Sequence, residues 1–229
     1  MTDVKPAVVK GPVVKAPVVK SRASGGRRER NARQTRHRIL TAAADLFTRQ
    51  GYAATTMQQI AERADVAWQT VYAVFGTKAA VLSAVFDVAV AGDDEPVPVA
   101  ERPFVQAIKD AADPKAKAAI FASHLRESAA RTARVLSVID AAAATDPEIS
   151  ELWHNLVRQG VQGMTLAARG FRDQGVLRPD LSIAKAADIL WIYVGPWTFR
   201  VLVTERGWTL DEYEKWLART LHTQLLTDE

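Results

Sequence analysis

The chain contains 229 residues, of which 48% are hydrophobic and 24% are charged, and its formal net charge is +4. This length and composition are typical of a globular protein with one large or two modest domains around a hydrophobic core. Because the sequence has no cysteine, disulfides, thiol catalysis and cysteine-bearing zinc sites are excluded.

Enzymatic chemistry finds no support in the sequence. The four histidines lie far apart without the spacing of metal ligands, and neither a phosphate-binding glycine loop nor a nucleophile elbow occurs. We therefore expect no catalytic residues, no metal and no other cofactor. No signal peptide is recognisable and the longest apolar run, residues 189–203, is too short for a membrane span, so we expect a cytoplasmic protein without a membrane partner.

Positive charge is concentrated in the N-terminal third. Residues 1–78 contain 14 Lys or Arg and 5 Asp or Glu, a balance of +9, whereas residues 79–229 contain 16 and 21, a balance of −5. A polyanionic partner would therefore bind the N-terminal part.

The first 26 residues form a low-complexity segment in which Pro and Val-Val pairs alternate with evenly spaced lysines. Repeated proline without an apolar stripe favours a disordered basic tail. The tail is either a solubilising extension or an electrostatic arm that follows a phosphate backbone. Residues 21–26 read as a flexible joint before an arginine-rich stretch. The lysines with a spacing of five are Lys5, Lys10, Lys15 and Lys20.

Residues 55–78 read as two short amphipathic helices joined by a tight turn at residues 65–67. Thr56 and Gln59 have capping-box spacing at the start of the first helix. Its apolar stripe is Met57, Ile60, Ala61 and Ala64, and that of the second helix is Val71, Val74 and Phe75. Trp68, Gln69, Tyr72 and Ala73 then remain on the face that packing does not require.

This segment and the helix expected before it, residues 35–52, together resemble the TetR family of bacterial transcriptional repressors. The matching steps are the first helix ending at Gly51, T-T-x-x-x-I-A at residues 55–61, T-V-Y-x-x-F at residues 70–75 and G-T-K at residues 76–78. The resemblance implies binding to double-stranded operator DNA. The DNA contacts that it implies, with the preceding arginines, are Arg33, Thr35, Arg36, Thr55, Thr56, Trp68, Gln69, Thr70, Tyr72 and Lys78.

Two features depart from the family pattern. Ala67 stands where many members carry a capping Ser, and residues 67–75 contain no Arg, Lys or His. The common Arg-to-guanine contact therefore cannot come from this helix. We expect phosphate contacts to supply affinity, while Trp68, Gln69, Thr70 and DNA shape supply specificity.

The rest of the chain reads as helix, with no strand alternation, so the expected fold class is all-α. The expected domains are the tail at 1–26, a helix-turn-helix domain at 27–78 and a helical effector-binding and dimerisation domain at 79–229. Capping-box spacing marks helix starts at Thr145 with Glu148 and at Thr209 with Glu212. The expected helices are 79–91, 104–112, 115–130, 132–144, 147–174, 183–205 and 210–226, with a kink at Gly195 and Pro196.

The family dimerises through its final helices, and the resemblance therefore implies a homodimer. Core burial explains the apolar stripes of these helices equally well. The interface candidates are Leu190, Val194, Val201, Tyr213, Leu217 and Leu221.

Large apolar side chains with a few polar groups in the second half predict a pocket for a small apolar or aromatic effector. The candidates are Phe121, His124, Trp153, Phe171 and Trp191, with Met164, Tyr193 and Trp197 as further members.

The sequence thus predicts a sequence-specific, ligand-responsive repressor that binds a palindromic operator as a dimer. An architectural, nucleoid-type DNA-binding protein with little sequence preference is the alternative.

Overall fold

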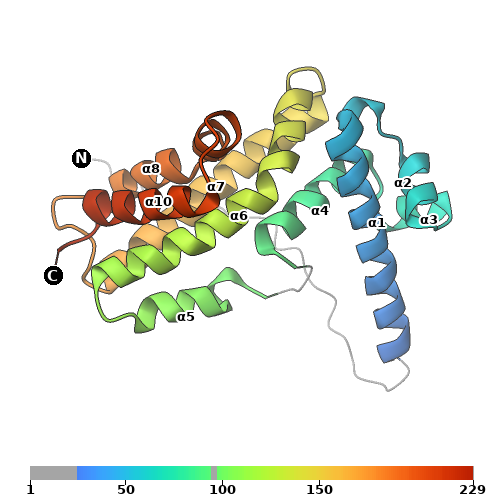
Figure 1. Ribbon diagram of the computed structural model, residues 1–229. Coiled ribbons are helices and arrows are strands. Elements are labelled where there is room, and N and C mark those ends of the chain that lie inside the picture. The colour runs from blue at the N-terminus through green and yellow to red at the C-terminus, as the bar shows by residue number, and fades with distance from the viewer. Residues whose placement is uncertain (1–24, 94–96, 229) are drawn as a thin grey trace, which may run out of the picture. The chain divides into compact units, whose positions relative to one another are not determined.

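The computed structural model describes residues 25–93 and 97–228, and these residues are helical without any strand (Figure 1). An isolated antiparallel bridge joins Leu177 and Leu226. The predicted all-α class is confirmed. The elements are α1 (Gly25–Ala54), α2 (Met57–Ala64), α3 (Trp68–Phe75), α4 (Lys78–Ala91), the 3-10 helix η1 (Val99–Glu101), α5 (Pro103–Asp110), α6 (Pro114–Ala143), α7 (Pro147–Asp173), α8 (Ile183–Val194), α9 (Pro196–Phe199), the π-helix η2 (Arg200–Glu205) and α10 (Leu210–Leu225).

Helix α1 begins earlier than predicted. The sequence predicts a first helix from residue 35, but the arginine-rich stretch before it is already helical from Gly25. The predicted joint at residues 21–26 is therefore wrong for Gly25 and Gly26, and the rest of it, like the tail, lies outside the described residues. Gly51, with φ 81°, interrupts the last turn where the sequence predicts the stop. Among the described residues, the chain divides into two units between Gln34 and Thr35.

Helix α6 is continuous over residues for which the sequence predicts two helices, 115–130 and 132–144. No glycine or proline lies inside it after Pro114, so the helix has no local reason to end. The start of α7 also differs, because Asp146 caps it by accepting from the amides of Glu148 and Ile149 at 2.9 and 3.2 Å. Thr145 instead donates its hydroxyl to a carbonyl of the preceding turn, so that predicted capping box is wrong. The predicted box at Thr209 and Glu212 is confirmed.

The predicted break at Gly195 and Pro196 is confirmed, because α8 ends at Val194 and Gly195 is extended, with ψ 153°. A Cβ at Gly195 would lie 2.8 Å from the carbonyl oxygen of Trp191 and 2.7 Å from the Trp197 ring, so only glycine fits this close approach. The chain then resumes as α9 and the π-helix η2.

One hydrophobic core joins the first four helices to the adjoining ends of α6 and α7. Ile39, Phe47, Ile60, Val71 and Leu82 have no exposed surface in it. It also contains Val135 and Ile139 of α6 and Ile149 and Leu156 of α7. Helix α4 packs on both α6 and α7 through this core, so it connects the helix-turn-helix with the C-terminal helices.

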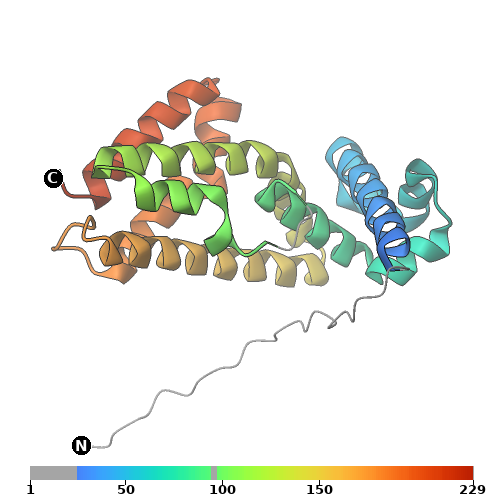
Figure 2. The ribbon, with the colours of Figure 1, turned by 90° about the horizontal axis from the view of Figure 1, so that it is seen from below.

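A second core lies between α5, α6, α7, α8 and α10. Helix α10 packs on α6, α7 packs on α8, and α5 lies beside α6 (Figures 1 and 2). Besides Phe121 of α6, most of its large buried side chains come from the last third of the chain. They are Phe171, Leu190, Phe199, Tyr213, Leu217, Leu221 and Leu225.

This core corrects the predicted dimer interface. Leu190, Tyr213 and Leu217 are fully buried, and Leu221 is 2% exposed, within one chain. These side chains form the apolar faces of α8 and α10, which are buried by packing inside the monomer. They therefore cannot contact a second copy. Val194 is half-buried against the same core, and only Val201, at 40%, is exposed.

The stretch Ile183–Glu205 is, among the described residues, long and apolar enough by composition alone to span a membrane. It is broken at Gly195, and it places Ala186, Leu190 and Phe199 in the second core. Part of its hydrophobicity therefore serves packing within the fold, while Ile192, Trp197 and Val201 stay exposed.

Candidate nucleic-acid interface and cavity

The predicted helix-turn-helix is formed by α2 and α3. Thr56 Oγ1 accepts from Gln59 N at 3.1 Å and Gln59 Oε1 accepts from Thr56 N at 2.9 Å, which completes the predicted capping box. The four apolar residues predicted on α2 are all buried. Asp65 ends α2 in the left-handed region, with φ 50°, and Arg38 Nη2 donates to its carbonyl and carboxylate oxygens at 2.6 and 2.8 Å. The sequence alone did not predict this role of Arg38, which connects α1 to the turn between α2 and α3.

Helix α3 exposes the side chains that the sequence placed on its free face. Trp68 and Tyr72 are 54% and 47% exposed, and their rings meet edge to face with centroids 5.5 Å apart. Gln69 is exposed and Thr70 is half-buried. Val74, predicted to be buried, is 43% exposed, because this eight-residue helix buries fully only Val71.

The N-terminus of α3 has no side-chain cap. Ala67 provides only its carbonyl, which accepts from Thr70 N at 2.9 Å. The front of this helix therefore carries unpaired amides and a partial positive charge, which suit an anion such as a phosphate.

The two threonines before α2 have structural tasks. Thr55 is fully buried and its hydroxyl donates to Gly51 O at 2.8 Å, so its side chain cannot make the predicted phosphate contact. Thr56 is exposed, and its hydroxyl already accepts from Gln59. A phosphate at this helix start would be bound through backbone amides rather than through Thr55 Oγ1.

Lys78 is tied to the end of α1. Its Nζ donates to Tyr52 O at 2.8 Å and Thr55 O at 2.9 Å and lies 4.1 Å from the centroid of the Tyr52 ring. Burial lowers the pKa of Lys78, and Asp146 opposes this shift. Burial, with Asp146 and Glu148, raises the pKa of Tyr52 to about 12. The predicted contact of Lys78 with DNA stays a prediction.

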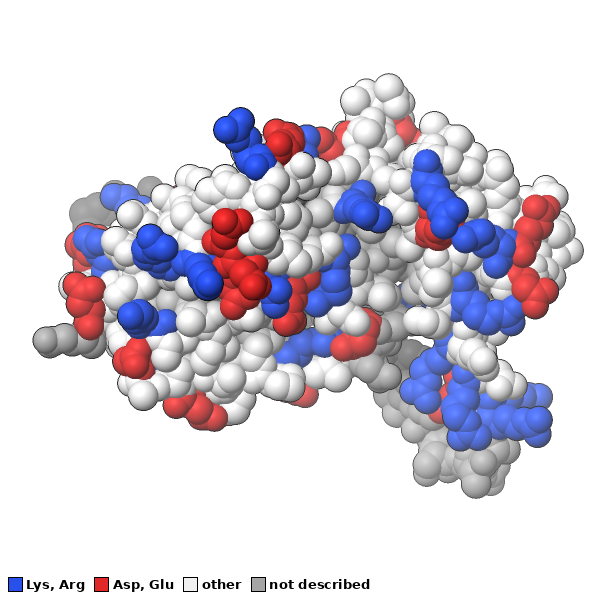
Figure 3. Space-filling model, in the orientation of Figure 1, with Lys and Arg blue, Asp and Glu red and all other residues white. Residues whose placement is uncertain are grey.

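Arginines gather on the N-terminal half of α1 (Figure 3). In this stretch Arg27, Arg28, Arg30 and Arg33 are exposed. Further along, Thr35 and Arg36 are half-buried, and the Arg36 guanidinium lies 5.0 Å from the centroid of the Phe75 ring. Exposed arginines on one helix are typical of a surface that meets phosphate.

A cavity of about 730 Å³ lies among α4, α5, α6, α7 and α8. Phe86 and Val90 of α4 form part of its wall, so the helix that follows α3 lines the cavity directly. All five effector candidates line it, namely Phe121, His124, Trp153, Phe171 and Trp191, together with Met164. Tyr193 does not line it, and Trp197 lies in a neighbouring hollow.

Two close packings shape this cavity. The Trp191 ring lies over Gly160, where a Cβ would come within 2.6 Å of Trp191 Cη2. The His124 ring stacks on Phe104 with centroids 3.5 Å apart and planes 7° from parallel. Gly160 is therefore the residue that allows the indole to lie against α7.

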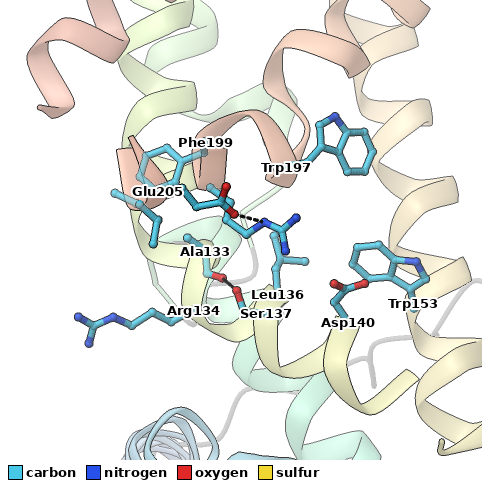
Figure 4. A pocket seen from close by; sticks show the side chains of 12 residues that line it. Ala133, Arg134, Leu136, Ser137, Asp140, Trp153, Trp197, Phe199 and Glu205 are labelled. Atoms are coloured by element: carbon cyan, nitrogen blue, oxygen red, sulfur yellow. Dashed lines mark hydrogen bonds and ion pairs between the residues drawn. The ribbon is translucent and has the colours of Figure 1, made fainter. Parts of the chain in front are cut away.

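The second hollow, of about 550 Å³, shares Ala133, Leu136, Trp153 and Phe199 with the first (Figure 4). It is more polar, and two of its lining residues form an ion pair, Arg200 Nε with Glu205 Oε1 at 3.4 Å. Trp153 and Phe199 thus line both the apolar cavity and this more polar hollow. Within the described ranges, no group of three or more His, Asp or Glu side chains is placed to hold a metal ion.

Comparison with known proteins agrees with this geometry. Residues 39–85 match the model of the bacterial regulatory proteins of the tetR family. The chain is 29% identical over 174 residues, 74% of its length, to the HTH-type transcriptional regulator YdeS of Bacillus subtilis (strain 168), covering 79% of that protein.

Solved structures share the fold at low identity. SmeT, the repressor of the Stenotrophomonas maltophilia multidrug efflux pump SmeDEF, is 24% identical in its complex with triclosan, with a TM-score of 0.63, over 85% of this chain and 92% of that one. NalD, the secondary repressor of the MexAB-OprM multidrug efflux pump in Pseudomonas aeruginosa, is 20% identical, with a TM-score of 0.61, over 86% and 98%. The helix-turn-helix geometry and the match over residues 39–85 together identify this segment as a helix-turn-helix domain of the tetR-family type.

Proposed function

We propose that this regulator is a ligand-responsive repressor that binds a palindromic operator as a homodimer and releases it when an effector fills the cavity. The cavity wall formed by Phe86 and Val90 carries this proposal, because both belong to α4. Helix α4 begins shortly after α3 ends, so an effector that moves α4 also moves the recognition helix.

The release requires differential binding. An effector with equal affinity for the DNA-competent and DNA-incompetent states would shift nothing, so it must bind the incompetent state more tightly. The proposal is supported by SmeT, which has a similar fold and whose structure was solved in complex with triclosan. Repressors of efflux pumps also occur among the similar structures.

A single recognition helix of eight residues reads few base pairs, which supports a two-fold dimer whose α3 helices enter successive major grooves roughly 34–36 Å apart. Since the stripes of α8 and α10 are buried in the monomer, we place the dimer contact on exposed apolar side chains at the end of α8 and beyond it. These are Ile192, Trp197 and Val201, which are 58%, 39% and 40% exposed.

The front of α3 reads bases in this proposal. Gln69 can pair with adenine, and the exposed ring of Trp68 can contact a thymine methyl group. Tyr72, Arg33, Thr35 and Arg36 would position the domain through phosphates without specifying sequence.

Selection of bound sites from a random DNA library, with and without residues 1–26, tests the proposal. It should yield a palindrome that is preferred over random DNA by a factor of about 10³ or more. Equal affinity for all sequences would replace it with the architectural function, which the basic tail and the uncharged α3 favour. No catalytic role is proposed, and a cytoplasmic location follows from DNA as the partner.

A further inference from the structure

The lining of the cavity restricts the charge of its occupant. Most of the lining side chains are apolar, and the described residues that form it include no Asp or Glu. Lys109 and His124 are its only titratable members among these residues. A primary ammonium ion that enters loses strong hydration without gaining a carboxylate partner, so the cavity disfavours this kind of cation.

His124 is the polar side chain of the cavity wall that can form a hydrogen bond with a ligand. Its stack on Phe104 fixes the plane of the ring. Within the described part of the chain, no side chain or carbonyl forms a hydrogen bond with either ring nitrogen. A half-buried imidazole without a partner, at the wall of an apolar cavity, has hydrogen-bonding capacity to offer a ligand.

The charge state of His124 follows from its surroundings. Burial lowers its pKa, and the guanidinium groups of Arg131 and Arg102 act in the same direction, while Glu127 opposes them. Lys109 of α5, on the same cavity, adds a further positive charge. The imidazole is therefore neutral at neutral pH, with one nitrogen as donor and the other as acceptor.

Two other polar side chains on the wall, Thr132 and Gln174, are engaged or turned away. The Thr132 hydroxyl donates to Ser128 O at 2.8 Å. Gln174 Nε2 donates to Gly170 O at 2.9 Å, and because that carbonyl only accepts, the amide nitrogen must face it. Gln174 Oε1 is left buried without a partner and is not accessible from the cavity without a shift of the side chain.

We propose that the effector is a neutral, predominantly aromatic molecule with one hydroxyl group, and that this hydroxyl forms a hydrogen bond with the imidazole of His124. The ring system packs against the cavity wall to which Phe121, Phe171 and Trp191 contribute, and His124 determines specificity. This inference rests on the proposed function and names the ligand class of the same cavity.

Calorimetric titration of the full chain, without DNA, with three probes on one ring frame tests the proposal. The probes are 2-naphthol, naphthalene and 2-naphthylmethylammonium. We expect 2-naphthol to bind roughly tenfold more tightly than naphthalene, as one net hydrogen bond predicts. The ammonium probe should bind at least about tenfold more weakly than 2-naphthol because its charge finds no partner.

His124→Phe keeps an aromatic ring for Phe104 and removes both nitrogens, so 2-naphthol and naphthalene should then bind equally well. His154→Phe, the same change on an exposed α7 histidine that does not line the cavity, should keep the tenfold preference. An equal affinity of the wild type for all three probes, a preference that survives His124→Phe, or no binding of any probe would each overturn the proposal.

The three probes with the wild-type protein still test the proposed ligand class even if His124→Phe does not fold. The DNA library selection measures the proposed function separately, since it needs no effector. If the protein selects a palindrome but prefers the ammonium probe, only the proposed ligand class is wrong. If it binds 2-naphthol but no operator, the proposed repressor function is wrong.

Discussion

The Thr77 hydroxyl lies 3.0 Å from Glu148 Oε1 and donates a hydrogen bond to it, while it accepts from Ala80 N at 3.1 Å. One oxygen atom therefore caps the start of α4 and binds the first turn of α7. Because α4 follows the recognition helix and also lines the cavity, this contact lies on the route by which the effector and DNA sites would influence each other.

Removing each partner of this contact should have different results. Thr77→Val loses the cap and the bond to α7, and should lower the free energy of unfolding by about 1–2 kcal/mol. Glu148→Ala leaves the cap intact and should cost less than about 1 kcal/mol, but should reduce the effector-induced decrease in operator affinity. Chemical denaturation and operator titration with and without 2-naphthol measure both quantities. An unchanged ratio of operator affinities in Glu148→Ala would show that the bond carries no coupling.

Restoring the missing cap of α3 should stabilise the protein. Ala67 is extended, with φ −64° and ψ 141°, a backbone conformation from which a Ser hydroxyl accepts an amide of the first turn. Ala67→Ser should raise the free energy of unfolding by about 0.5–2 kcal/mol. Ala73→Ser, an exposed position inside the same helix, is the matched control and should be neutral or slightly destabilising. A stabilisation shared by both variants would exclude capping as its cause.

Substitution by alanine should have opposite effects on stability at two glycines of α7. Gly160→Ala places a methyl group within 2.6 Å of Trp191 Cη2, so the indole must move, and we expect a decrease in stability of about 1–3 kcal/mol. At Gly163 a Cβ meets nothing within 4 Å, so Gly163→Ala should gain up to about 1 kcal/mol of helix propensity. Thermal unfolding measures both, and Trp fluorescence shows whether the indole moves. Equal effects at the two positions would mean that Trp191 is free to adjust.

Base reading by α3 is testable at Gln69. Gln69→Ala should cost about 1–3 kcal/mol of binding to the selected operator and relax the preference at one base position per half-site. Tyr72→Phe, which removes only a phosphate hydrogen bond, should weaken binding to all sequences alike. Repeated site selection with each variant distinguishes the two roles. If the selected sites of Gln69→Ala matched those of the wild type, specificity would come from elsewhere.

Deletion of residues 1–26 should weaken binding to operator and random DNA equally. The segment contains five Lys or Arg, and for each phosphate that is no longer neutralised the negative slope of log K against log salt concentration should become shallower by about 0.9. Titration at several salt concentrations measures the slope. A slope that is the same in the shortened chain would reduce the tail to a solubilising extension.

Local patterns predicted the parts of this protein that depend on neighbours in sequence. The capping box of Thr56 and Gln59, the apolar stripe of α2 and the exposed Trp68 and Tyr72 were all predictable, because helix caps and helical periodicity involve residues three or four apart. The aromatic side chains of the second half also predicted five of the residues that line the cavity, but Tyr193 and Trp197 do not line it.

Only the tertiary structure decided what each buried face packs against. Periodicity shows that Leu190, Tyr213 and Leu217 are covered, but the partner is α6 and the rest of the monomer core rather than a second copy. In the same way, Lys78 binds the carbonyls at the end of α1, 23 and 26 residues away. Such contacts depend on the packing of distant segments, which no local pattern encodes. The sequence alone thus determined that the chain is all-α with a helix-turn-helix, and the packing determined which surfaces remain free for the proposed contacts with DNA, effector and a second copy.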